Sequence, residues 1–207
     1  DLGDKRGAIA DYSKAIAIDP QYADAYYNRG FVKSDLGDKQ GAIADLNQAT
    51  AINPQNANSY RNRGIAKSAL GNNRGAIADY NRAIAINPQD TIVYTNRGVV
   101  KSALGDKQGA IADYNRAIAI DPKNDFAYNN RANAKSALGN KQSAITDYSR
   151  AIAINPQNAR AYNGRGNAKS ALGNKQGAIA DYNRAIAINP QDVETYFNRG
   201  LFKFNLA

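Results

Sequence analysis

The six prolines of this chain recur at a fixed interval of 34 residues. They are Pro20, Pro54, Pro88, Pro122, Pro156 and Pro190. A period of this length is the signature of a stacked repeat array. Each repeat in such an array contacts only its neighbours, so the core is an elongated seam. The chain thus supplies its own alignment, in which invariant columns indicate scaffold and variable columns indicate function.

Each period contains the signals of two helices. An Asn or Asp that can act as an N-cap precedes the first helix, and another precedes the second. A glycine between them stands where a left-handed residue closes a helix. The first caps are Asn56, Asp90, Asn124, Asn158 and Asp192; the glycines are Gly37, Gly71, Gly105, Gly139 and Gly173; the second caps are Asp38, Asn72, Asp106, Asn140 and Asn174. Apolar residues spaced as on a helix follow, and the residue before each proline ends the second helix.

The alignment predicts five complete units and two partial ones. Their boundaries are 1–22, 23–56, 57–90, 91–124, 125–158, 159–192 and 193–207. The first segment is a second helix without its first, and the last is a first helix without its second. We therefore expect further repeats in the natural protein. We also expect end-to-end stacking of copies, in which Asp11 would pair with Arg199.

A column of small residues lies in the middle of the first helices. Glycine there costs about 1 kcal/mol relative to alanine, so we expect a second helix to approach closely. The predicted partner is an alanine column of the second helices. The two columns are Gly30, Gly64, Gly98, Ala132, Gly166 and Gly200, and Ala42, Ala76, Ala110, Ala144 and Ala178.

This pattern resembles the tetratricopeptide repeat (TPR) family. The matching landmarks of one unit are Tyr94, Gly98, Ala110, Tyr114, Ala117 and Pro122. The resemblance covers essentially the whole chain. It implies an all-α fold, a right-handed superhelical α-solenoid of about 12 helices. It also implies that the first helices line a groove that binds peptides of a partner protein.

Two columns depart from the family motif, with Arg where the family has Leu and Lys where it has Tyr. We predict that each Arg pairs with an invariant Asp of the second helix, because guanidinium binds carboxylate bidentately. The alternative is a clamp for a phosphate or carboxylate ligand. For the Lys column we expect the stem to pack on the helix and the ammonium to reach water. The predicted pairs are Arg29–Asp45, Arg63–Asp79, Arg97–Asp113, Arg131–Asp147 and Arg165–Asp181.

Variation between repeats concentrates on one stripe of the first helices, beside a nearly invariant Asn that is interrupted at Gly164. We predict that the Asn amides bind a peptide backbone, to which they can both donate and accept, while the stripe selects side chains. The alternatives are an inter-repeat contact for the Asn and neutral drift for the stripe. The Asn column is Asn28, Asn62, Asn96, Asn130 and Asn198. The stripe residues are Tyr27, Phe31, Arg61, Ile65, Thr95, Val99, Phe126, Asn129, Asn133, Arg160, Asn163 and Asn167.

Composition bounds the function classes. Histidine and cysteine are absent, and the carboxylates recur as caps and predicted pairs, so we expect no enzyme, metal or cofactor. No apolar run approaches the roughly 18 residues of a membrane span. Of three candidate functions, a protein-interaction scaffold comes first and a self-assembling array second. Nucleic-acid binding comes third, because the net charge of +9 is spread over all repeats.

Overall fold

The computed structural model describes residues 2–204, and within them it contains twelve α-helices and no strand. The helices are α1 (Leu2–Ile18), α2 (Ala23–Asp35), α3 (Lys39–Ile52), α4 (Ala57–Ala69), α5 (Asn73–Ile86), α6 (Thr91–Ala103), α7 (Lys107–Ile120), α8 (Asp125–Ala137), α9 (Lys141–Ile154), α10 (Ala159–Ala171), α11 (Lys175–Ile188) and α12 (Val193–Phe204). The all-α repeat fold and its helix number are therefore confirmed. The right-handed sense of the superhelix stays a prediction.

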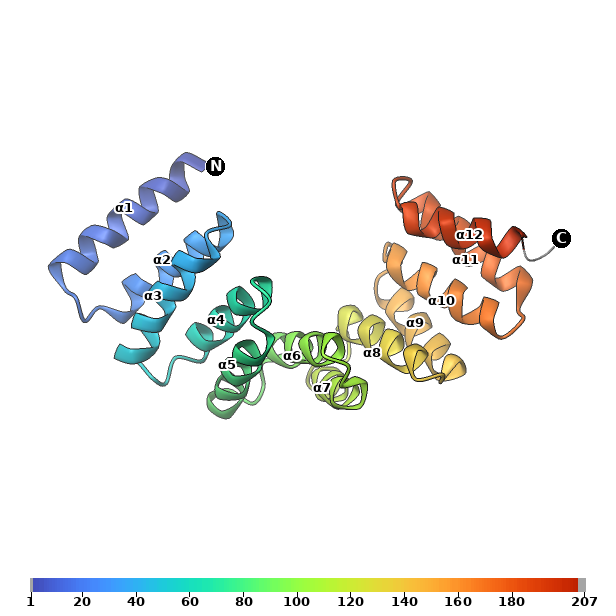
Figure 1. The fold of residues 1–207 in the computed structure, drawn as a ribbon, viewed down its shortest axis with the longest axis horizontal. Helices are drawn as coiled ribbons and strands as arrows, with labels where there is room; N and C mark the ends of the chain where they lie inside the picture. The colour runs from blue at the N-terminus through green and yellow to red at the C-terminus, as the bar shows by residue number, and fades with distance from the viewer. Residues whose placement is uncertain (1, 205–207) are drawn as a thin grey trace. The chain divides into compact units, whose positions relative to one another are not determined.

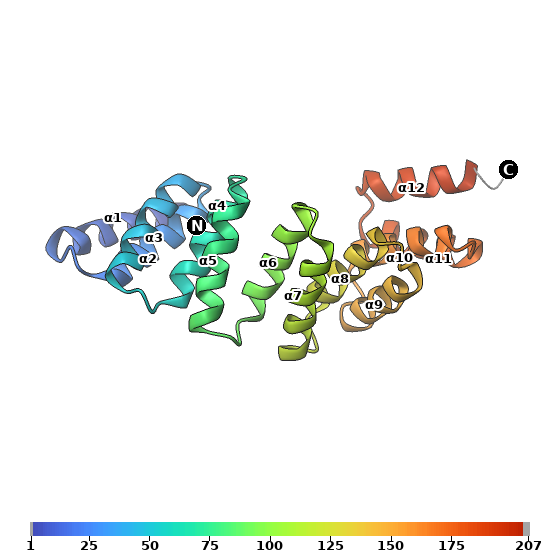
Figure 2. The same ribbon diagram turned by 60° about the horizontal axis from the view of Figure 1, so that its bottom comes forward.

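The helices form two compact units, divided between Val100 and Lys101 (Figure 1). In unit 1, consecutive helices from α1 to α5 pack on each other. In unit 2, the same holds for consecutive helices from α7 to α12 (Figure 2). Alternate helices also touch, because α2 contacts α4, and α10 contacts both α8 and α12. Within each unit the first helices of successive repeats thus lie side by side.

The turns between paired helices have the predicted geometry. All five turn glycines have positive φ, between 77° at Gly173 and 92° at Gly105, a region that L side chains rarely adopt. The second helices α3, α5, α7 and α11 are preceded by an N-cap residue, whose side chain accepts a hydrogen bond from the backbone N–H of the glycine three residues later. At α9 the cap residue Asn140 makes no such bond.

The residue three positions after the cap differs at α9. It is Ser143 there, and glycine in the four second helices whose cap bond forms. The caps of the first helices α4, α8 and α10 accept from the N–H of Ser59, Ala127 and Ala161, so a Cβ at this position does not by itself prevent the bond.

We expect Asn174→Ala to lower the free energy of unfolding by about 1 kcal/mol, the usual value of an N-cap. The matched control is Asn140→Ala in the neighbouring repeat, which removes no cap bond and should change stability by less than about 0.5 kcal/mol. Urea unfolding of both variants checks this. Equal losses would show that the cap bond contributes nothing.

The core of each unit consists of alanines and large second-helix side chains. The alanine columns are fully buried, and Leu46, Tyr80, Tyr114 and Tyr182 are among the largest fully enclosed side chains. The predicted glycine contact differs in detail. A Cβ at Gly30 would lie 3.1 Å from the carbonyl oxygen of Ala42, as expected. At Gly64 and Gly166, however, the nearest side chains are the rings of Tyr80 and Tyr182.

Candidate functional site

The arginine column forms buried ion pairs with the aspartate column. Arg29 donates from Nε to Oδ2 of Asp45 at 2.9 Å and from Nη2 to Oδ1 at 2.7 Å. Asp45 is buried and the Arg29 side chain is largely enclosed. The hydrogen bond to Asp45 raises the pKa of Arg29 above its ordinary value. The pair joins the two helices of one repeat.

The same bidentate contact recurs in three other repeats. It joins Arg63 with Asp79, Arg131 with Asp147, and Arg165 with Asp181. Arg97 and Asp113 belong to different units, and their pairing stays a prediction.

The expectation for the lysine column is wrong. The ammonium groups do not reach into water but bind the same aspartates, as Lys33 does to Oδ2 of Asp45 at 2.8 Å. Only 20% to 23% of these lysine side chains is exposed. The Asp45 carboxylate thus binds two cations with one negative charge. Sequence reasoning missed this because Lys was expected to prefer solvent. The other lysines that bind an aspartate of this column are Lys67, Lys101, Lys135 and Lys169.

The third nitrogen of each guanidinium reaches the preceding repeat. Nη1 of Arg131 donates to Oδ1 of Asn115, and Nη1 of Arg165 donates to Oγ of Ser149. The Arg131 guanidinium also lies over the ring of Tyr128, 5.3 Å from its centroid. The acceptor column contains only Asn or Ser in every repeat, a regularity in the sequence from which this contact could have been predicted. The arginine donors are thus occupied by the scaffold, and no free phosphate or carboxylate clamp is seen among the pairs described.

Part of the variable stripe also makes contacts between repeats. Nδ2 of Asn62 donates to the hydroxyl of Tyr27 at 3.3 Å. Arg61, expected to face a ligand, instead donates to Oδ2 of Asp90 at 2.8 Å. In unit 2, Nδ2 of Asn198 donates to Oδ1 of Asn163 at 3.2 Å. These are contacts within the scaffold of the kind given as the alternative expectation, and burial accompanies them at Asn62 and Asn163.

Other predicted residues remain available to a ligand. Asn28, Asn96 and Asn130 are half-buried and make no side-chain hydrogen bond among the residues that the structure describes. Phe31, Val99 and Phe126 are exposed, as is Arg160, whereas Ile65 is half-buried. Thr95 donates its hydroxyl to the carbonyl of Thr91.

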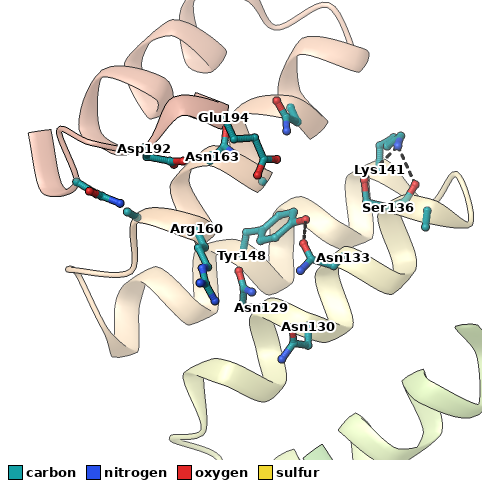
Figure 3. A pocket seen from close by; sticks show the side chains of 15 residues that line it. Asn129, Asn130, Asn133, Ser136, Lys141, Tyr148, Arg160, Asn163, Asp192 and Glu194 are labelled. Carbon is teal, nitrogen blue, oxygen red and sulfur yellow. Dashed lines mark hydrogen bonds between the residues drawn. The ribbon is translucent and has the colours of Figure 1, made fainter. Parts of the chain in front are cut away.

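Cavities open on the first-helix face of each unit. In unit 1, one of about 150 Å³ is lined by Phe31, Asn62 and Ile65, and one of about 120 Å³ by Ile65, Asn96 and Val99. In unit 2, a cavity of about 620 Å³ has a polar lining that includes Asn129, Asn130, Asn133, Arg160, Asn163 and Asn167. Figure 3 shows these side chains projecting from α8 and α10 around Tyr148. The face is apolar with interspersed amides in unit 1 and rich in amides in unit 2.

The two residues of the predicted end-to-end pair belong to different units, and each has a contact within its own unit. Asp11 lies 3.6 Å from Lys14 on the same helix, and both are well exposed. Arg199 donates to Asn183 and lies over Tyr196. The contact between copies stays a prediction.

In the described part of the chain, no group of three or more Asp or Glu residues could hold a metal ion. Within residues 2–204, no helix is long and apolar enough to cross a membrane. The cavity linings offer amide and apolar groups and, in unit 2, side chains of both charges.

Paired antiparallel helices at a 34-residue period define an α-helical repeat protein, a fold typical of protein-binding scaffolds. A family profile described as "TPR repeat" matches residues 1–37, 34–71 and 68–105. Profiles described as "Tetratricopeptide repeat" match residues 92–124 and 129–193. The chain belongs to the tetratricopeptide repeat family.

Comparison with curated proteins found no match. Many solved structures share the fold. A crystal structure of MamA is 27% identical with a TM-score of 0.72, over 77% of this chain and 93% of that one. YrrB, described as a TPR protein with an unusual peptide-binding site, is 18% identical with a TM-score of 0.74, over 91% and 97%. A TPR protein from Parabacteroides merdae is 22% identical with a TM-score of 0.82, over 100% and 82%.

Proposed function

We propose that this chain is a non-enzymatic scaffold that binds an extended or helical segment of a partner protein along the first-helix face of its repeats. The observation that carries the proposal is the coexistence on this face of exposed apolar side chains and unbonded amides. Phe31 is 53% exposed and Val99 44% exposed, and Asn28 and Asn96 lie on the same helices without a hydrogen-bond partner.

The chemistry of the face suits a peptide better than a nucleic acid. A peptide backbone alternates donors and acceptors, which a carboxamide can satisfy in either sense. Exposed apolar groups grouped on one surface usually mark a binding site. Phosphate binding would require several free cations, but the described Arg–Asp pairs hold their arginines within the scaffold, which leaves Arg160 as the exposed arginine of the stripe. We take the repeats at 23–56, 57–90, 91–124, 125–158 and 159–192 as the units of recognition.

The proposal predicts that Asn28→Ala combined with Asn96→Ala weakens peptide binding without unfolding the protein. Two lost hydrogen bonds are worth about 1–3 kcal/mol, so affinity should fall about 5-fold to 150-fold. The probe is a fluorescein-labelled twelve-residue peptide selected from a random library against the whole chain, measured by fluorescence polarisation. Asn62 is left intact because it bonds to Tyr27.

The matched control removes two exposed amides from the second helix of the same unit, with Gln40→Ala and Gln48→Ala in α3. This variant should bind the peptide as the unaltered chain does. The proposal fails if no library peptide binds, or if both double variants bind equally well.

A further inference from the structure

The asparagine column is interrupted at Gly164, and the interruption leaves a buried acceptor without a partner. The two asparagine contacts between first helices join residues 35 apart, Asn62 with Tyr27 and Asn198 with Asn163. The same step from Asn129 leads to Gly164, which has no side chain. Asn129 is only 7% exposed. Its Oδ1 is buried with it and nevertheless accepts no hydrogen bond.

An orphaned acceptor of this kind requires an explanation. More than about 90% of buried polar groups in proteins are hydrogen-bonded. Asn163, the equivalent of Asn129 in the next repeat, is equally enclosed at 7% exposure but accepts from Asn198. The difference between these two repeats is therefore the missing amide at position 164.

The side chain missing at Gly164 also makes room for Tyr148. A Cβ at this glycine would lie 2.5 Å from Cζ of Tyr148 and 2.7 Å from its hydroxyl oxygen. The ring is held there because the hydroxyl donates to Oδ1 of Asn133 at 2.6 Å (Figure 3). Burial raises the pKa of Tyr148 to about 12, so its hydroxyl stays protonated and able to donate at neutral pH.

We propose that the cavity beside Gly164 takes an amide N–H of a bound peptide, and that the Asn129 side chain turns on binding so that its enclosed Oδ1 accepts from this N–H. The cavity measures about 620 Å³ and is lined by Asn129, Tyr148 and Gly164. This inference rests on the proposed peptide-binding function and names the chemistry that unit 2 recognises. The N–H can come from the peptide backbone or from an Asn or Gln side chain.

The remaining groups of the cavity complement the rest of an amide. Oδ1 of Asn133 accepts from Tyr148, and Oδ1 of Asn163 accepts from Asn198. Their Nδ2 groups are left as donors, which suit the carbonyl oxygen of the same ligand. One peptide group can thus donate to Asn129 and accept from a neighbouring asparagine.

The charges around the cavity favour a neutral ligand. Two cations, Lys141 and Arg160, and two anions, Asp192 and Glu194, line it, so their formal charges cancel. Lys141 is moreover bonded to the carbonyl and hydroxyl oxygens of Ser136. A peptide with neutral polar side chains is therefore expected to bind better than a charged one.

The first test separates a ligand-binding asparagine from a structural one by thermal unfolding. Asn129→Leu removes an unpartnered buried oxygen, so Tm should stay unchanged or rise. Asn163→Leu, its match in the next repeat, leaves Asn198 without an acceptor and should lower Tm. A loss of Tm in Asn129→Leu as large as that in Asn163→Leu would overturn the inference.

The second test measures binding on the isotope-labelled whole chain by NMR. The probes are acetylated and amidated pentapeptides of serine with glutamine, alanine, leucine or lysine at the centre. Saturable shifts of the Gly164 backbone amide and the Asn129 side-chain amide are expected, and these shifts should be lost in Asn129→Leu. Stronger binding of the glutamine peptide assigns the N–H to a side chain, and equal binding of the glutamine and alanine peptides assigns it to the backbone. Binding of the lysine peptide alone, or no shift with any peptide, overturns the inference.

A third variant closes the cavity from within the chain. Gly164→Asn combined with Tyr148→Leu reproduces the natural combination of Asn62 with Leu46, sixteen residues before it. The new amide should donate to Asn129 and abolish the pentapeptide shifts in a folded protein. Unchanged shifts would contradict the inference while leaving the binding measured in unit 1 intact. Conversely, pentapeptide binding without any effect of the Asn28 and Asn96 substitutions on the library peptide would support the cavity and contradict the role proposed for the unit 1 asparagines.

Discussion

Asp147→Ala is expected to lower the free energy of unfolding by about 3–5 kcal/mol, the usual cost of removing one partner of a buried ion pair. The Asp147 carboxylate is buried and accepts two hydrogen bonds from Arg131, at 2.8 Å and 2.6 Å. It also binds the ammonium of Lys135 at 2.8 Å. The substitution therefore leaves two enclosed cations without a counter-charge. Urea unfolding followed by circular dichroism measures the loss.

A double-mutant cycle isolates the pair itself. Arg131→Ala, Asp147→Ala and the combined variant should give a coupling energy within about 0.5–3 kcal/mol, because the residues are in direct contact. Arg150→Ala, an exposed arginine of the same helix α9, serves as the control and should change stability by less than about 0.5 kcal/mol. A coupling energy near zero would show that the pair contributes no specific stability.

The loss of stability on removing one partner of the pair need not equal the stability that the intact pair contributes. Replacing both partners of a buried ion pair with well-packed apolar residues is often neutral or stabilising. Arg131→Met with Asp147→Leu should therefore recover most of the stability lost in Asp147→Ala. Lys135 would still lose its carboxylate and Asn115 its bond from the guanidinium, so the recovery should be incomplete.

The helices and turns of this fold could be predicted from sequence because their signals are local. A glycine with positive φ after each first helix, a cap before each second helix and a proline after it act within a few residues of the chain. Repetition of these signals over the chain made the alignment reliable. The exception is Asn140, whose side chain makes no cap bond although it occupies the same position in its repeat.

The partners of long side chains were harder to predict, because they depend on which repeat a side chain reaches. The Arg column was assigned one partner, the Asp sixteen residues later, but its third nitrogen bonds the residue sixteen positions earlier. Lys135 was assigned to solvent by its chemical type, although the buried carboxylate lies within its reach. Spacing alone does not show that two cations share one anion.

Some of the predicted peptide-binding residues are bonded within the scaffold and others are not, and residues of one sequence column fall in both groups. Asn62 and Asn130 occupy the same column, yet the first is buried against Tyr27 and the second lines a cavity without a bond. The difference depends on the neighbouring repeats. Only the three-dimensional contacts show which asparagines the scaffold uses and which remain for a ligand.

The glycine column offers a test in which one substitution has opposite effects at two places. A Cβ at Gly166 would lie 2.8 Å from Cε1 of Tyr182, a ring that is 2% exposed and whose hydroxyl donates to Asn167. Gly166→Leu must displace this ring, and overpacking of this kind costs about 1–3 kcal/mol. The lost tyrosine hydrogen bond adds about 1 kcal/mol.

At Gly200, in the same column, a Cβ would meet nothing within 4 Å. Gly200→Leu should therefore raise stability by up to about 1 kcal/mol, since leucine is the better helix former. Gly166→Ala should cost less than Gly166→Leu, because Ala132 occupies the same column beside Tyr148 in the preceding repeat. Urea unfolding of the three variants gives both signs and magnitudes. If Gly166→Leu and Gly200→Leu changed stability equally, helix propensity rather than close packing would explain the glycine column.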